Sequence, residues 1–166
     1  MSHRVIAIGS PFGADRAAWS VVDGLRGRVP AEVELITLDR PGAALITRLD
    51  ADIDVILIDA AIGGPTDRPF VRVLPEHLAR DGTRLDTHRQ QIADTLALAK
   101  TLGRLPRRLA IYAIDIVADN VTSVSSFTPS GVRLLTVFLL NKLNECGTQP
   151  DQGQLPLGPL TVRFDP

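Results

Sequence analysis

Two aspartates and a histidine stand at positions where an α/β fold would bring them together as metal ligands. Asp15 follows an apolar run at 5–9, Asp59 closes a second run at 55–58, and His88 opens a long helical pattern. In an open α/β sheet, the ligand crevice forms at the carboxyl ends of the strands. We therefore expect these carboxylates and this imidazole to form a divalent-metal site that uses no cysteine.

This set of ligands limits which metals suit the site and what the site can do. Carboxylate and imidazole groups suit borderline ions such as Zn²⁺, Ni²⁺, Co²⁺ or Mn²⁺. Two oxygens and one nitrogen leave coordination positions for water or a substrate group. Each residue also has a simpler interpretation: Asp15 could cap the following helix, Asp59 could be a buried charge with a structural partner, and His88 could be exposed in a first helical turn.

Length, composition and charge point to one ordinary globular domain. The chain has 166 residues, is 45% hydrophobic and 22% charged, and carries a formal net charge of −1. This balance gives no electrostatic footprint for nucleic acid, and no apolar stretch approaches the ~18 residues needed to span a bilayer. We expect neither nucleic acid nor a membrane as a partner.

Cysteine content and the N-terminal sequence favour a cytoplasmic protein. Cys146 is the only cysteine, so an intrachain disulfide and a four-cysteine zinc site are both excluded, which fits a reducing compartment. The first residues run straight into a short apolar strand without the apolar core of a secretory signal.

Strand and helix patterns alternate along the chain. Short apolar or alternating runs predict strands at 4–8, 32–38, 53–58, 70–74 and 109–114, and four-residue spacing of apolar residues predicts helices at 16–25, 43–49, 87–102 and 130–144. This order predicts a three-layer α/β/α sandwich with a mostly parallel twisted sheet, and the 70–74 run is expected to be an antiparallel edge strand. Residues 1–147 form the domain and 148–166 a Gly-, Pro- and Gln-containing tail, in which 160–164 is either an edge strand or a surface segment.

Several local signals refine this picture. Right-handed crossovers would align Gly9, Asp59 and Asp115 along one edge of the sheet. Thr87 and Gln90 match a capping box at the start of a helix. His3 and His77 are expected to be solvated, and Trp19 is expected in the core or at a partner contact. Ser10 follows a strand but has no histidine at a signature spacing, and the dinucleotide, P-loop and serine-hydrolase signatures are absent.

Four segments in a fixed order carry a resemblance to a known family. They are Gly9-Ser10-Pro11-Phe12-Gly13-Ala14-Asp15-Arg16, Leu57-Ile58-Asp59-Ala60-Ala61, Asp86-Thr87-His88 with the Leu/Ala-rich 92–99, and Phe127-Thr128-Pro129-Ser130-Gly131-Val132. In order and spacing the chain resembles the nickel-iron hydrogenase maturation endopeptidases over about residues 4–145. The resemblance implies their phosphorylase/hydrolase-like α/β fold.

The resemblance also implies an activity and roles for individual residues. These enzymes remove a short C-terminal extension from the precursor of a hydrogenase large subunit after nickel insertion. Asp15, Asp59 and His88 correspond to the metal-contacting positions, with Ni²⁺ supplied by the substrate and Zn²⁺ or Cd²⁺ as surrogates in crystals. Arg16, Asp39 and Gly42 fall in substrate-facing loops. No residue is identified as the nucleophile or base.

The sequence departs from the family pattern in these loops. Ser10 replaces an asparagine, Ala14-Asp15-Arg16 replaces Asp-Asp-Gly, and a turn with a proline at position 41 replaces a glycine-rich one. A divergent, inactive member that binds a hydrogenase subunit without cutting it is therefore a second hypothesis. A hydrolase of another class on a similar scaffold is a third, because a fold does not determine an activity.

Overall fold

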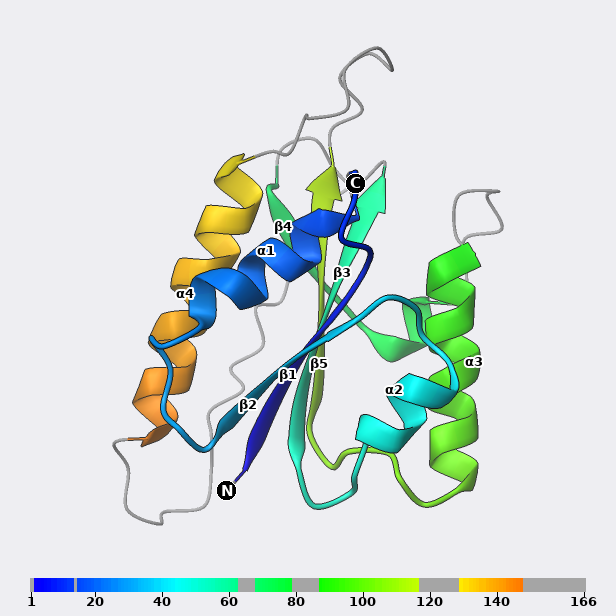
Figure 1. Ribbon diagram of the computed structural model, residues 1–166. Helices are drawn as coiled ribbons and strands as arrows, with labels where there is room; N and C mark the ends of the chain where they lie inside the picture. The colour runs from blue at the N-terminus through cyan, green and yellow to red at the C-terminus, as the bar shows by residue number, and fades with distance from the viewer. Residues whose placement is uncertain (1, 14, 63–67, 79–86, 117–128, 148–166) are drawn as a thin grey trace, which may run out of the picture.

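In the described part of the chain, five strands form one sheet, and four α-helices cover its two faces (Figure 1). The computed structural model describes residues 2–13, 15–62, 68–78, 87–116 and 129–147. In chain order the elements are β1 His3–Ile8, α1 Arg16–Leu25, β2 Val33–Leu38, α2 Ala43–Arg48, β3 Asp54–Ile62, β4 Phe70–Val73, a 3₁₀ turn Pro75–His77, α3 Thr87–Thr101, β5 Leu109–Ile116 and α4 Pro129–Gly147.

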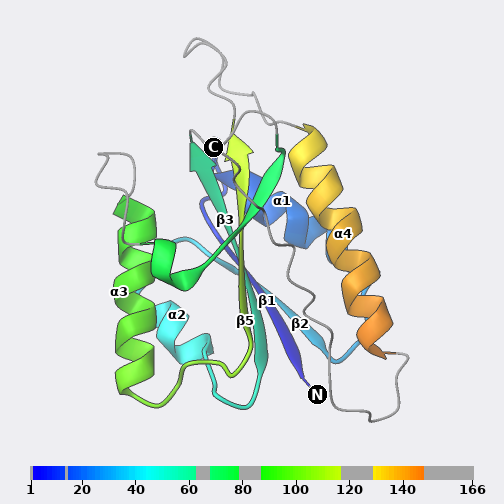
Figure 2. The same ribbon diagram turned by 180° about the vertical axis from the view of Figure 1, so that it is seen from behind.

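The strand order is β2-β1-β3-β5-β4, and every pairing is parallel except the antiparallel pair of β4 with β5. Helices α1 and α4 lie on one face of the sheet, and α2 and α3 lie on the other (Figures 1 and 2). The predicted three-layer architecture with an antiparallel edge strand is confirmed. The central strands are apolar on both sides because both of their faces are covered.

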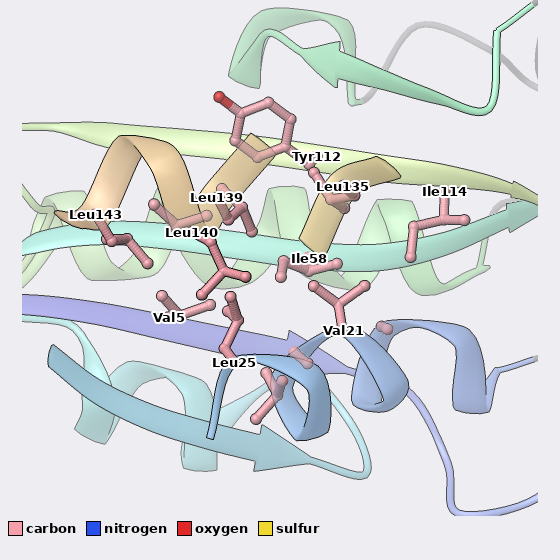
Figure 3. Close-up of a cluster of buried hydrophobic side chains, with 14 of the residues drawn as sticks. Val5, Val21, Leu25, Ile58, Tyr112, Ile114, Leu135, Leu139, Leu140 and Leu143 are labelled. Atoms are coloured by element: carbon pink, nitrogen blue, oxygen red, sulfur yellow. The ribbon is translucent and has the colours of Figure 1, made fainter. Parts of the chain in front are cut away.

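Two hydrophobic clusters, one on each face, hold the layers together. On the α1/α4 face, Leu25, Leu139 and Leu143 pack against residues of the central strands such as Ile58 (Figure 3). On the α2/α3 face, the buried residues include Ile6, Ile8, Leu45, Leu49, Leu57, Ile92 and Leu96. The four-residue spacings in α1, α3 and α4 therefore mark the faces that meet the sheet.

Two glycines allow α4 to approach its neighbours closely. A Cβ on Gly24 of α1 would lie 3.0 Å from Thr136 Cγ2 of α4, and a Cβ on Gly131 would lie 2.7 Å from the Pro69 carbonyl oxygen. Helix α3 ends in a Schellman motif, in which Gly103 has φ +68° and the Arg104 amide donates to the Ala99 carbonyl. The predicted stop at Gly103 is confirmed.

Several boundaries differ from the sequence prediction. Strands β3 and β5 run on to Ile62 and Ile116, because the two strands keep pairing with each other up to that point. Helix α4 is longer than predicted, from Pro129 to Gly147, and α2 ends at Arg48. The Gln90 side-chain amide donates to Asp94 at 2.9 Å, one turn further along the helix. The predicted capping box involves the Thr87 side chain, which lies outside the described residues, and it stays a prediction. The predictions for 148–166, including a strand at 160–164, lie outside the described residues.

The expectation that His3 is solvated is wrong. Its side chain is only 13% exposed, and its Nδ1 lies 3.9 Å from Asp54 Oδ2, which is itself 3.7 Å from Arg108 Nη1. Neighbouring strands flank His3 on both sides, with Val33 and Asp54 as its register partners. Burial lowers the pKa of His3, although the adjacent Asp54 raises it. The exposure predicted for His77 is confirmed.

Candidate functional site

The loop after β1 lies directly on the end of that strand, and this contact positions Asp15. A Cβ on Gly9 would lie 2.1 Å from the Asp15 carbonyl oxygen and 3.6 Å from Trp19 Cδ1. Glycine is therefore required here for space. The Gly9 amide and the Trp19 indole N–H both donate to the Leu38 carbonyl, at 3.0 and 3.3 Å, which joins the ends of β1 and β2 to α1. Trp19 is half-buried against the core, as predicted.

Asp15 does not cap the helix that it precedes. The residue has helical dihedral angles, φ −64° and ψ −16°, and its side chain makes no capping hydrogen bond to α1. An N-cap residue normally has extended dihedral angles and accepts a bond from an amide of the first turn. The simpler interpretation of Asp15 is not supported, and its half-buried carboxylate stays available for another role.

Asp59 lies near the carboxyl end of β3, on the face of the sheet covered by α2 and α3. Successive side chains of a strand alternate between faces, and Leu57 belongs to the α2/α3 cluster while Ile58 and Ala60 pack on the α1/α4 side. The Asp59 side chain is only 5% exposed. Burying a carboxylate costs free energy unless neighbouring groups stabilise its charge. We therefore expect Asp59 to have a structural or functional role.

A second buried carboxylate, Asp115 of β5, lies beside Asp59. Asp59 is in register with Ala113, and Ala61 is in register with Asp115, so the two aspartates are diagonal neighbours on one face. Asp115 is 7% exposed, and its amide donates to the Pro69 carbonyl at 3.2 Å. Topology predicted from the sequence puts Asp115 at this edge, but the predicted ligands are only Asp15, Asp59 and His88. Its position after an apolar strand was the signal that could have identified it.

His88 is in the first turn of α3. This helix precedes β5, which starts at the amino-terminal edge of the sheet, so α3 must begin near the carboxyl edge (Figures 1 and 2). The helix packs on the same face that carries Asp59. The His88 side chain lies outside the described residues, and the proposed trio of ligands is therefore not tested as a cluster.

Among the described side chains, no three His, Cys, Asp or Glu residues gather as a metal site. Asp15 and Asp59 lie near this edge on different segments of the chain, and a site of three protein ligands that includes both needs a third donor whose side chain is not described. The first turn of α3 is the element that could provide it. The metal-ligand prediction stays a prediction.

The predicted substrate-contacting residues surround the same edge. Arg16 is exposed in the first turn of α1, which contains no acidic residue. Asp39 is exposed, and its Oδ2 lies 3.8 Å from Arg40 Nε. Gly42 has φ +116° and ψ −144° directly before α2, a backbone conformation that favours glycine. Arg16 begins the helix that follows the β1 loop, and Asp39 and Gly42 lie between β2 and α2.

The Ser10 hydroxyl is used within its own turn. It accepts a hydrogen bond from the Phe12 amide at 3.1 Å and donates to the Phe12 carbonyl at 3.0 Å. Serine side chains commonly stabilise turns in this way. A structural role explains Ser10 fully, which weakens the hypothesis of a serine hydrolase.

The fold is similar to the folds of several solved structures. The hydrogenase maturating endopeptidase HybD from E. coli matches with a TM-score of 0.64 and 20% identity, over 89% of this chain and 94% of that chain. The chain has the fold of the hydrogenase maturation endopeptidases. Two proteins from Thermococcus kodakarensis described as [NiFe] hydrogenase maturation proteases match similarly: HycI (TM-score 0.65, 16% identity, 86% and 92% coverage) and HybD (TM-score 0.63, 21% identity, 87% and 99% coverage).

The resemblance read from the sequence is thus confirmed at the level of the fold. No family model matches the sequence, and no curated protein matches it. In the described part of the chain, no helix is both long enough and apolar enough to cross a membrane.

Proposed function

We propose that this protein is a cytoplasmic endopeptidase that removes the C-terminal extension from a nickel-loaded [NiFe]-hydrogenase large subunit. The observation that carries the proposal is the arrangement of residues at the carboxyl ends of the strands. There the Asp15 loop rests on Gly9, Asp59 is buried on the α3 face, and α3 begins with His88 in its first turn. The same fold is found in proteins described as hydrogenase maturation endopeptidases.

In this proposal, Asp15, Asp59 and His88 contact the nickel ion that the precursor carries. Two carboxylates and an imidazole suit Ni²⁺, and also ions such as Zn²⁺ that can replace it in a crystal. Three protein ligands leave positions for groups that belong to the precursor. A metal bound in this way can position the precursor and polarise the carbonyl of the bond to be cut.

The surrounding loops would hold the segment of precursor to be removed. Arg16 adds a cation to the amino-terminal end of α1, where the helix dipole is already positive. This end of the helix is therefore suited to an anionic group of the precursor. Asp39 and Gly42 lie in the adjacent loop, where no atom lies within 4 Å of the position that a Cβ on Gly42 would take, which leaves space for an approaching chain.

The test is cleavage of a nickel-loaded precursor by the purified protein, followed by mass spectrometry of the large subunit. Asp59→Asn and His88→Gln are expected to lower the cleavage rate by at least about 100-fold, since each removes a group that binds the reacting region. Asp94→Asn and His77→Gln are matched controls on exposed positions. Normal cleavage by both Asp59→Asn and His88→Gln would refute the proposed site.

A non-catalytic binding role is the alternative that the Asp15 loop favours. Arg16 places a positive charge next to Asp15, where a carboxylate and a glycine flank the aspartate in the family pattern. The same incubation separates the two functions. A stable complex with the precursor and no change in its mass would indicate binding without cleavage.

A further inference from the structure

Phe12 is the most exposed large hydrophobic residue among those described. Its side chain is 80% exposed, compared with 56% for Leu102 and 49% for Leu98. Isolated apolar residues on a surface are common, so exposure alone does not indicate a function. The conformation of Phe12 and its position in the fold are what indicate a function.

The backbone that carries Phe12 is fixed by several contacts. The Ser10 hydroxyl bonds to both the amide and the carbonyl of Phe12, Gly13 follows with φ +66°, and the Arg16 amide donates to the Gly13 carbonyl at 3.3 Å. A turn that is already ordered loses little backbone freedom when a partner binds it. The turn therefore holds the ring out in solvent in advance of binding.

The place of Phe12 relates it to the proposed site. It lies in the loop between Gly9 and Asp15. Exposed charged residues are found at the start of α1, which follows this loop (Arg16), and in the loop after β2 (Asp39 and Arg40). The Gly9–Leu38 hydrogen bond joins the two strand ends from which these loops leave. Aromatic residues are enriched at protein interfaces and among the residues that contribute most of the binding energy.

We propose that Phe12 is an anchor for the folded large-subunit precursor and enters an apolar pocket of that protein. The inference rests on the proposed function and names how its substrate is recognised. Phe12 is in the same loop as the proposed ligand Asp15 but is itself apolar. Its partner is therefore a hydrophobic surface of the precursor near the metal, and not the metal itself or the segment of precursor to be removed. Such an anchor selects a folded protein over a free peptide.

The experiment measures cleavage kinetics and complex formation with nickel-loaded precursor for three variants. Phe12→Ala is expected to raise KM and the dissociation constant of the complex about 10- to 100-fold while leaving kcat nearly unchanged. Phe12→Leu, which keeps an apolar side chain, should recover most of the affinity. Leu102→Ala is the matched control, since Leu102 is also exposed but follows α3 at the opposite edge of the sheet.

The possible results separate the inference from the function it rests on. Unchanged KM and affinity in Phe12→Ala, with normal cleavage by the wild type, would overturn the anchor and leave the protease intact. A wild-type protein that neither binds nor cuts the precursor would overturn both. If Phe12→Ala instead converts a dimer to a monomer in sedimentation without changing KM, the ring contacts a second copy of this chain and the proposal is wrong.

Discussion

Replacing Gly9 with alanine tests whether the close contact between Gly9 and the Asp15 loop controls both the stability of the fold and the geometry of the candidate site. The added Cβ would lie 2.1 Å from the Asp15 carbonyl oxygen. This oxygen belongs to the backbone and has no rotamer through which it could move away. The loop and the start of α1 must shift by about 1 Å to restore a normal contact distance.

The expected size of the effect follows from this geometry. Overpacking a tight contact costs about 1–3 kcal/mol, which for a domain of this size lowers Tm by roughly 2–12 °C. A displacement of about 1 Å at a reacting group can cost about 100-fold in rate. We therefore expect Gly9→Ala to melt earlier, to exchange the amide hydrogens of residues 15–18 faster, and to cleave precursor about 100-fold more slowly.

Gly103→Ala provides the matched control. Gly103 has φ +68° and no atom within 4 Å of its added Cβ, so this variant should lose about 1–2 kcal/mol of stability through backbone strain alone. It lies after α3, away from the Asp15 loop, and should cleave normally. If Gly9→Ala has wild-type Tm and exchange rates, the close contact does not constrain the loop and the reasoning fails.

Three other predictions address the core, the amino-terminal edge and the metal. Leu139→Ala removes a side chain that is 0% exposed and should cost about 2–5 kcal/mol of unfolding free energy, measured in urea; a loss below about 1 kcal/mol would contradict the packing in Figure 3. Burial is the largest cause of the lowered pKa of His3, the amino terminus and Arg108 lower it further, and Asp54 and Glu32 oppose them. The unfolded chain therefore binds more protons, so this contribution to stability is complete above the ordinary pKa of 6.5 and is lost as pH falls from 6.5 through the lower folded pKa. His3→Asn should flatten that loss in melts between about pH 7 and pH 5, and an unchanged pH dependence would refute it. Precursor prepared without nickel should not be cleaved, and equal cleavage with and without nickel would show that the metal is not recognised.

The sequence predicted the elements well wherever a periodic apolar pattern determined burial. Leu25, Leu96 and Leu139 all face the core as their spacing indicates. The ends of β3 and β5 were less predictable, because the extra residues are strand only through their pairing with each other. His3 was misjudged for a similar reason: its position near the start of the chain does not reveal that β2 and β3 flank it.

The candidate site also has features that the sequence predicts and features that it does not. Parallel topology alone indicated that Asp15 and Asp59 share an edge of the sheet, because strand ends are predictable from the order of elements. The close contact between Gly9 and the Asp15 carbonyl depends on the path of the loop, which no local pattern encodes. The exposure of Phe12 is equally invisible in the sequence, since a phenylalanine is more often buried than exposed.

The two hydrophobic clusters give the edge an unusual mechanical arrangement. Asp15 directly precedes α1, which is packed into the layer with α4, whereas Asp59 lies in β3 on the face of the sheet that α2 and α3 cover. The sheet thus acts as a spacer between two separately packed halves. A volume change within either layer would move its helices relative to the sheet, and would thereby shift Asp15 relative to Asp59 without altering either residue.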